Sequence, residues 1–390
     1  MSHALILAHM KNTRYIHGGA IYRESIRNML TRNDPSLIVD EIFVHPQHSR
    51  IWRQWRQVFD IVASQFSKYP AKVNHFRTRR FRFRVLAALS VQSYSLFVIN
   101  GAEMLWTLEL LPPKARILFI SHNIEHRLYE QQVARYDNVL WLGRLLRADA
   151  EKFKNFEIDH IRQVNKIVTI ADDDRKILSR FAPSASISTI LPSFDYKPHP
   201  RLITPLDEES SEMSTQRPSQ TRPLRLGFLG NLEWWPNSRS LQWFLDEVWP
   251  HIGNNIELHL YGQGSAVMHD DSRIIGHGFV RDLDQVWQEV DLMIQPISCG
   301  AGINIKVAES LYNRMPIIAT PLAVRGISLH DDPAIKILAE AHEWINYLNG
   351  PEPAKHALLT ARQENADLFC MAKNSATLQQ LLKGDTSWPQ

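Results

Sequence analysis

Cysteine is scarce in this chain: its 390 residues include only Cys299 and Cys370, which lie far apart in the sequence. Two such residues exclude a disulfide framework and are typical of proteins in a reducing compartment. Long apolar runs are also missing, and no stretch approaches the roughly 20 apolar residues of a membrane span. The start of the chain, MSHALILAH, lacks the basic residues and the apolar length of a signal peptide. We therefore expect a cytoplasmic protein, either soluble or held peripherally at the inner face of a membrane.

Charge of one sign is in small excess, since 44 lysines and arginines stand against 41 acidic residues and give a net charge of +3. That excess is too small to indicate nucleic-acid binding unless the cations gather in one patch. The hydrophobic content of 44% is that of a globular protein, and the length suffices for two domains with separate cores.

Apolar segments of strand length alternate with helical segments on both sides of one polar stretch, residues 199–222. That stretch is rich in Pro, Ser, Glu, Thr and Gln, and it holds too little apolar surface to fold, so we interpret it as a linker. The expected strands are residues 4–8, 39–44, 94–100, 116–121 and 166–171 before it, and 225–229, 256–261, 274–280, 292–297 and 316–320 after it. Residues 186–194 close the first half and residues 334–338 are a further apolar run, while helices are expected at 103–111 and 341–348 among others. This alternation predicts two doubly wound, Rossmann-like α/β domains, residues 1–198 and 223–364, followed by a helical segment at 365–390.

The most informative stretch runs from the expected strand 292–297 through a loop of small residues to a helix that opens near Asn304. In a strand–loop–helix–strand unit the loop lies at the carboxyl end of a parallel strand, where helix N–H groups attract an anion. Small residues at 300–302 let a phosphate or a sugar approach the main chain. Lys306 and Glu309 project from one helix face, so a cation can reach a diphosphate while a carboxylate accepts hydrogen bonds from two ribose hydroxyls. A surface ion pair on an ordinary helix is the other interpretation of this spacing.

The same residues carry a resemblance. The run GAGINIKVAES at 300–310, followed by MPIIAT and AVRG, resembles the donor-binding segment of retaining glycosyltransferases of group 1 (family 4), which have the GT-B fold of two domains facing a cleft. Many members carry a further Glu where this chain has Ala301. The chain looks more like the branch with a glycine-rich donor loop, which also lacks that Glu and usually has Arg at the position of Asn304.

The resemblance implies roles for individual residues. Glu309 would bind the ribose of a nucleotide, Lys306 its diphosphate, and the amides of Gly300, Ala301, Gly302 and Ile303, with Asn304, the sugar. A second similar segment, GNLEWWPN, places Gly230 and Asn231 at the site, and Phe279 and Val280 would lie against the base. In the first domain, the Gly18–Gly19 pair and His122, within the similar run SHNIE, would face the cleft. We take His122, Lys306 and Glu309 as the catalytic candidates.

Two further features invite chemistry but have simpler explanations. Cys299 adjoins the glycine loop and could be a nucleophile, although a loop-filling cysteine explains it equally simply. Residues 172–174 are three aspartates, and an Asp-x-Asp motif occurs in metal-dependent transferases. Acidic residues at a helix start satisfy orphan N–H groups and the helix dipole, so we interpret these aspartates as helix caps. No metal and no cofactor is expected.

Residues 50–84 concentrate ten cations and eight large aromatics around a single acid, Asp60. This composition is typical of a helix lying on an anionic membrane, and it also suits single-stranded nucleic acid. Amphipathic helices with aromatics in the core and solvated arginines are the third interpretation. We predict peripheral contact with an anionic membrane and no nucleic-acid partner.

Taken with the resemblance, the sequence predicts a retaining glycosyltransferase of polysaccharide biosynthesis that needs no metal. It would move a hexosyl group from a UDP- or GDP-sugar to a saccharide or a lipid-linked saccharide. Two alternatives stay open. One is a sugar-nucleotide epimerase or hydrolase on the same fold, and the other is a nonenzymatic protein that binds a sugar or a membrane.

Overall fold

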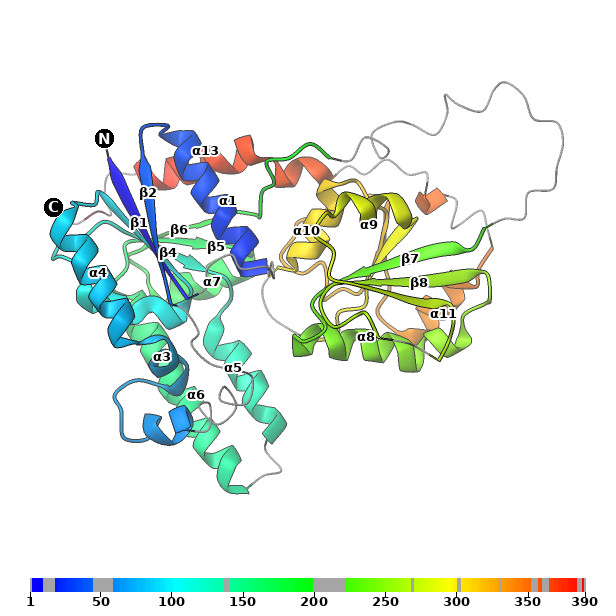
Figure 1. Ribbon diagram of the computed structural model, residues 1–390, viewed down its shortest axis with the longest axis horizontal. Helices are drawn as coiled ribbons and strands as arrows, with labels where there is room; N and C mark the ends of the chain where they lie inside the picture. The colour runs from blue at the N-terminus through cyan, green and yellow to red at the C-terminus, as the bar shows by residue number, and fades with distance from the viewer. Residues whose placement is uncertain are drawn as a thin grey trace. The chain divides into compact units, whose positions relative to one another are not determined.

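The structure is a computed structural model that describes residues 2–9, 18–44, 59–136, 140–198, 222–267, 270–299, 303–329, 332–351, 357–359, 365–383 and 388 (Figure 1). It divides the chain into two compact units. Unit 1 comprises Met1–Pro192 and Met371–Gln390, and unit 2 comprises Ser193–Cys370. Within the described ranges, no helix combines the length and the apolar character needed to cross a membrane.

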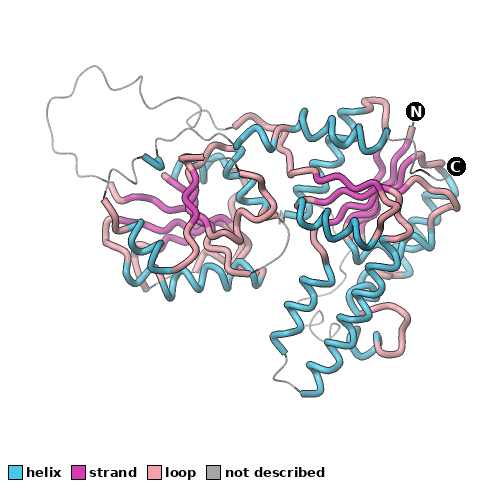
Figure 2. The backbone as a smooth tube through the Cα atoms, turned by 180° about the vertical axis from the view of Figure 1, so that it is seen from behind, coloured by secondary structure: helices cyan, strands magenta, loops and turns pink. Residues whose placement is uncertain are grey.

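Unit 1 is built on a six-stranded, fully parallel sheet in the order β2-β1-β3-β4-β5-β6. Its strands are β1 (His3–Ala8), β2 (Ile38–Phe43), β3 (Leu96–Asn100), β4 (Ile117–Ser121), β5 (Lys166–Thr169) and β6 (Ser186–Thr189). The central strands β3 and β4 are buried along their whole length, as expected when helices cover both faces of a parallel sheet. Figure 2 shows helices on both sides of these strands.

The helices of unit 1 come from both ends of the chain. They are α1 (Gly18–Asn33), α3 (Ala71–Phe76), α4 (Arg79–Val91), α5 (Glu125–Val133), α6 (Leu140–Ile161), α7 (Asp172–Phe181) and α13 (Met371–Lys383), with the 3₁₀ segments η1 (Ala102–Leu110) and η2 (Ala134–Tyr136). The last helix packs beside the first, because Ser375 Oγ donates to Asn33 Oδ1 at 2.7 Å and Asn33 Nδ2 donates to the Ser375 carbonyl at 2.8 Å (Figure 1). Lys166 Nζ, on β5, is buried and donates to the Leu381 carbonyl at 2.7 Å.

Unit 2 repeats the plan with a second parallel six-stranded sheet, in the order β12-β11-β10-β7-β8-β9. Its strands are β7 (Leu224–Leu229), β8 (Ile256–Tyr261), β9 (Ile274–Gly278), β10 (Leu292–Gln295), β11 (Ile317–Ala319) and β12 (Ile335–Ile337). Its helices are α8 (Trp235–Glu247), α9 (Asp284–Glu289), α10 (Ile305–Tyr312) and α11 (Ala341–Leu348), with 3₁₀ segments η4 (Trp249–His251) and η5 (Asn365–Phe369). A core around Phe244 and Trp344 covers one face of this sheet.

The predicted fold class of two doubly wound α/β domains is confirmed. The expected strands all form, although that at 274–280 ends at Gly278, whose φ of 74° leaves the extended region. The predicted helix at 103–111 is a 3₁₀ helix. The predicted linker falls almost entirely on residues 199–221, which lie outside the described residues.

Candidate functional site

In unit 2 the carboxyl ends of β7, β10 and β11 meet at one edge of the sheet, where ligands bind in open α/β sheets. Main-chain bonds fix this edge. Gly230 N, just beyond β7, donates to the Tyr261 carbonyl at 2.8 Å, and Thr320 N, beyond β11, donates to the Gln295 carbonyl at 3.1 Å. Helix α10 starts beside it, with Asn304 as the N-cap residue whose side chain makes no capping bond. Its first amides are therefore free of a side-chain cap at this edge.

Lys306, in the first turn of α10, extends toward the end of β7. Its Nζ donates to Asn237 Oδ1 at 2.8 Å and lies 4.9 Å from the centre of the Phe228 ring. A Cβ added to Gly230 would stand 2.6 Å from this nitrogen, so a larger residue there would displace the amine from its position. Burial lowers the pKa of Lys306 to about 7, because an ammonium group is poorly solvated here. An incoming anion would restore its charge.

Asn237 is the residue that positions this amine, and the sequence interpretation did not select it. Its Nδ2 donates to the Asn231 carbonyl at 2.8 Å while its Oδ1 accepts from Lys306. Asn231 in turn accepts from Glu233 N through Oδ1 at 2.8 Å, which shapes the loop after β7. Asn237 ends the segment GNLEWWPN, so its presence there was the one available signal.

Glu309, one turn further along α10, is held by a different group of residues. Tyr196 donates its hydroxyl to Glu309 Oε1 at 3.3 Å, and Asn313 Nδ2 donates to the Tyr196 hydroxyl at 2.9 Å. The Tyr312 hydroxyl fixes Tyr196 from its main-chain side by donating to the Tyr196 carbonyl. Glu309 is only 6% exposed, and burial raises the pKa of its carboxyl to about 7 although Tyr196 opposes the shift.

The two charged residues of α10 do not pair with each other. The ion pairs among the described residues include none between Lys306 and Glu309. Each is anchored separately, Lys306 by Asn237 and Glu309 by Tyr196. The structure therefore shows no surface ion pair here, because both groups are buried and each bonds to another side chain.

A second tight contact holds the ends of β8 and β9. Gly262 has a φ of 119°, and a Cβ placed there would lie 2.2 Å from the Gly230 carbonyl oxygen. Gly262 N donates to the Gly278 carbonyl at 2.7 Å, and Ser265 Oγ accepts from Gly278 N at 3.0 Å. Directly beyond, Phe279 is 42% exposed and Val280 is half-buried. The edge thus presents an aromatic ring at the place where the sequence predicts base contact.

Comparison with known proteins agrees with this arrangement. Residues 223–347 match the sequence profile of the family described as "Glycosyl transferases group 1". This matched segment lies within unit 2. No curated protein sequence matches the chain.

Solved structures extend the likeness to both units. A structure of HepE from Anabaena with UDP-glucose is 12% identical, with a TM-score of 0.61, and 98% of this chain aligns with 99% of that one. Sucrose-phosphate synthase from Thermosynechococcus elongatus gives 12% identity and a TM-score of 0.62 over 97% and 98% of the two chains. WaaG, a glycosyltransferase of lipopolysaccharide biosynthesis, gives 13% and 0.59 over 98% and 100%. At such identities the likeness shows the fold, which is GT-B.

The other predicted site residues of the loop before α10 lie partly outside and partly within the described residues. Gly300, Ala301 and Gly302 lie outside the described residues. Ile303 is buried, and Asn304 is half-buried at the start of α10. The Cys299 thiol is half-buried and makes a weak hydrogen bond to the Pro236 carbonyl at 3.9 Å, as a loop-filling cysteine does.

Gln295, the last residue of β10 in unit 2, was not predicted as a site residue from the sequence. It is fully buried, and neither its amide nitrogen nor its amide oxygen has a hydrogen-bond partner in the described part of the chain. A buried amide left unpaired is costly and marks a place where a ligand or a neighbouring segment supplies the partner.

In unit 1, His122 follows β4 directly and is held on two sides. Its Nε2 lies 2.9 Å from Asn100 Oδ1, at the end of β3, and its ring stands edge-on to Tyr22 with centroids 5.7 Å apart. Gly18 and Gly19 form the first turn of α1, the helix that carries Tyr22. The structure therefore brings the predicted His122 and the helix opened by the glycine pair to one edge of the unit 1 sheet.

The same edge holds ionisable groups that the sequence interpretation passed over. Burial lowers the pKa of His9, just after β1, to about 4, although Glu125 opposes this shift. Lys72 Nζ lies 2.5 Å from Glu125 Oε1. Burial raises the pKa of the Glu125 carboxyl, with Lys72 acting in the opposite direction. These groups make the edge polar and partly buried, as an active site requires.

The three aspartates at 172–174 start α7. Ala171 is the N-cap residue of this helix, so the interpretation of the aspartates as caps is wrong. Asp172 instead pairs with Arg175 at 2.6 Å and with Lys176 at 3.1 Å. These pairs lie within one helical turn, so the aspartates act through the helix dipole and local ion pairs.

The basic, aromatic stretch is described from residue 59 onward. Tyr69 and Phe81 are buried in the core, whereas Phe59, Phe66 and Phe83 are exposed. Helix α4 shows the division most clearly, because Phe81 and Val85 face inward while Arg79, Arg80, Arg82 and Phe83 lie outward. The interpretation in which all aromatics serve the core is wrong for these three phenylalanines.

Proposed function

We propose that the protein is a retaining glycosyltransferase that takes a sugar from a UDP- or GDP-sugar. The observation that carries this proposal is the separate anchoring of Lys306 and Glu309 on one short helix at the carboxyl edge of a parallel sheet. The buried amine beside a helix start is suited to bind a diphosphate, and the buried carboxyl one turn away is suited to accept hydrogen bonds from a ribose.

Lys306 and the α10 amides would stabilise charge that develops on the leaving diphosphate. This interaction grows as the bond to the sugar breaks, so it lowers the barrier and not only the energy of the bound donor. Glu309 would accept hydrogen bonds from the ribose hydroxyls and so hold the diphosphate of the donor beside Lys306. In a same-face substitution, the leaving diphosphate would take the proton of the acceptor, and His122 of unit 1 would contact the acceptor side.

The described neighbours indicate which donor to test first. HepE has been crystallised with UDP and with UDP-glucose, and a TarM variant with UDP and a glycosylated glycerol. We therefore place UDP-glucose first in a donor screen by thermal shift, followed by other UDP- and GDP-sugars.

Nucleotide release with and without added saccharide acceptors then separates the candidate functions. A transferase releases nucleotide chiefly when an acceptor is present, a hydrolase releases it without one, an epimerase changes the sugar without release, and a binding protein does neither. Retention is tested by NMR of the product anomer, which must keep the configuration of the donor. An inverted anomer would remove the same-face mechanism.

The pKa values of Lys306 and Glu309 predict a pH profile. Below about pH 7 the Lys306 amine carries the charge that a diphosphate needs, and above that pH it loses it, so kcat/KM for the donor should fall on the alkaline side. The Glu309 carboxyl ionises only above about pH 7, so kcat/KM should also fall on the acid side. The expected result is a narrow bell centred near pH 7. Lys306→Ala should abolish the alkaline limb, and an unchanged limb would assign it to another group.

Chelation should leave transfer intact. A helix start and Lys306 can neutralise a diphosphate without a cation, and Asp172 and Asp173 are engaged in local ion pairs. We expect less than a twofold change in initial rate after treatment with EDTA. Loss of activity that Mg²⁺ or Mn²⁺ restores would contradict this donor site.

We further propose that the exposed face of α4 docks unit 1 on an anionic membrane, where the acceptor is a lipid-linked saccharide. Three exposed arginines flank Phe83, which is 72% exposed, and Leu86 extends the apolar part of this face. Such a face combines electrostatic attraction with insertion at the headgroup level.

Vesicle co-sedimentation at low and high salt measures this docking. Each arginine contributes about 1 kcal/mol, so replacing Arg79, Arg80 and Arg82 by glutamine should weaken binding to anionic vesicles about 100-fold. Binding should also weaken as salt rises. Failure of the wild-type protein to bind anionic vesicles at low salt would show that this face of α4 is ordinary solvated surface.

A further inference from the structure

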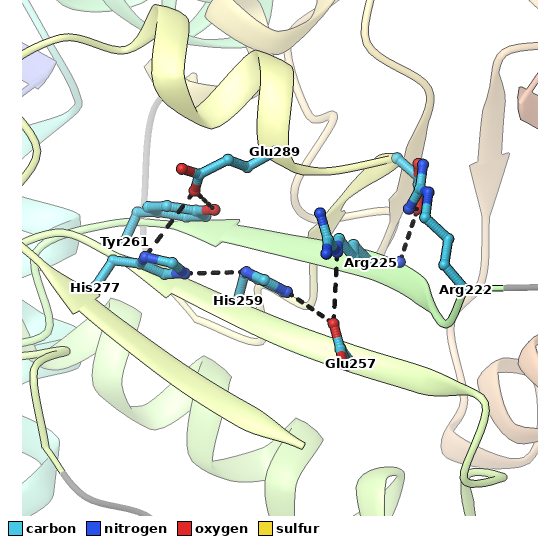
Figure 3. Close-up of polar contacts among 8 residues, drawn as sticks. Arg222, Arg225, Glu257, His259, Tyr261, His277 and Glu289 are labelled. Atoms are coloured by element: carbon cyan, nitrogen blue, oxygen red, sulfur yellow. Dashed lines mark hydrogen bonds and ion pairs between the residues drawn. The ribbon is translucent and has the colours of Figure 1, made fainter. Parts of the chain in front are cut away.

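A cluster of nitrogen and oxygen ligands lies on the sheet face of unit 2 that is opposite its core. Along β8, Leu258 and Leu260 point into the core, so the alternating residues Glu257, His259 and Tyr261 share the other face. His277 comes from the neighbouring edge strand β9, and Glu289 ends helix α9, which overlies these strands (Figure 3). None of these residues has a role in the proposed donor site.

Two imidazoles of this cluster face each other directly. His259 Nδ1 lies 3.0 Å from His277 Nε2, and one ligand atom from each of His259, His277 and Glu289 lies within 4.8 Å of the other two. Zinc binds imidazole nitrogen at about 2.0–2.1 Å, so two nitrogens 3.0 Å apart can both contact one ion placed between them. His277 and Glu289 are exposed, so their side chains have room to move toward a shared ion.

The outer contacts of the cluster are those that orient metal ligands. The other nitrogen of His259, Nε2, lies 3.3 Å from Glu257 Oε2, and Glu257 is itself paired with Arg225 at 3.5 Å. This contact favours the tautomer with the proton on Nε2, which leaves Nδ1 free to bind a cation. Tyr261 donates its hydroxyl to Glu289 Oε2 at 2.8 Å and stacks on the His277 ring at 4.3 Å, which holds both groups in place (Figure 3).

We propose that His259, His277 and Glu289 form a binding site for a divalent transition-metal ion of the Zn²⁺ class. Two imidazoles and one carboxylate are a set that zinc accepts, with water or a further ligand in the fourth position. Because imidazole does not suit Mg²⁺ or Ca²⁺, the site discriminates against both. The ion would tie β8, β9 and α9 together, just before Phe279 and Val280, which follow the end of β9.

Calorimetric titration of ZnCl₂ into untagged, chelator-treated and desalted full-length protein tests this site. We expect one saturable site, absent with MgCl₂, and a zinc-dependent rise in Tm, because a ligand bound only by the folded state stabilises it. His277→Ala and Glu289→Gln should each weaken zinc binding at least tenfold. His342→Ala, an exposed histidine on α11, is the matched control and should bind zinc as the wild type does.

The visible spectrum of the Co²⁺ complex gives a second readout that folding defects do not mimic. A four-coordinate site produces an intense visible band, which His277→Ala should lose while keeping the wild-type Tm without metal. Absence of saturable zinc binding, or equal binding by the wild type and His277→Ala, would reduce the cluster to an ordinary hydrogen-bond network.

Discussion

Lys306→Ala is expected to lower kcat/KM for the sugar-nucleotide donor by about 10- to 150-fold. The reason is that each charge-assisted hydrogen bond to the diphosphate contributes about 1.5–3 kcal/mol, and no other lysine or arginine in the described part of the chain contacts Asn237. The fold should persist, because the pKa of about 7 shows that burying this amine costs stability. Steady-state kinetics at pH 7 with the Tm as a folding check provide the measurement.

Glu309→Ala should reduce donor use to a similar degree, since it removes the carboxylate and leaves the Tyr196 hydroxyl without its acceptor. Glu309→Gln retains an acceptor for Tyr196 and should recover part of the loss. Lys336→Ala on β12 and Glu247→Ala on α8 are matched controls, because both side chains are exposed and distant in the sequence from the α10 edge. Near wild-type turnover in either α10 variant would remove the role assigned to that residue.

Gly262→Ala is expected to destabilise unit 2 strongly. An alanine would have to adopt a φ of 119°, and its Cβ would lie 2.2 Å from the Gly230 carbonyl oxygen, which is main chain and cannot rotate away. Left-handed strain and displaced backbone together cost about 3 kcal/mol or more. For a unit of this size that predicts a fall in Tm of about 6–12 °C.

The same substitution should reach the donor site through Gly230. Gly230 lies beside the Lys306 amine, so any shift of the Gly230 main chain would displace this amine. The substitution should therefore lower donor affinity as well as stability. Gly253→Ala is the control, because its Cβ would meet side-chain atoms and no main chain: Asn255 Oδ1 at 3.1 Å and Asn349 Oδ1 at 3.5 Å. Calorimetric melting of both variants gives the comparison, and a Gly262→Ala protein as stable as Gly253→Ala would show that the contact relaxes freely.

The sequence allowed the fold to be predicted where its signals are local. Apolar runs bounded by turns predicted ten of the twelve strands, and the other two, β6 and β12, fall within the segments 186–194 and 334–338. The helix predicted at 341–348 has the bounds found in the structure. The segment at 102–110 has the composition of a helix but forms 3₁₀ turns, because hydropathy does not distinguish the two windings.

The candidate site was predictable only in part, and the missed residues share a cause. Lys306 and Glu309 share a helix and a recognisable spacing, whereas their anchors, Asn237 and Tyr196, stand 69 and 113 residues away. Such contacts arise from tertiary packing, which no local pattern encodes. The pair His259 and His277, from two strands 18 residues apart, was missed for the same reason.

Direct binding of a nucleoside diphosphate tests the central claim most simply. Titration of UDP and of GDP into the wild-type protein at pH 7 should show one of them binding at a single site, with affinity reduced at least tenfold in Lys306→Ala and unchanged in Lys336→Ala. Binding of neither nucleotide, or equal affinity in the wild type and Lys306→Ala, would contradict a nucleotide-sugar site at the start of α10.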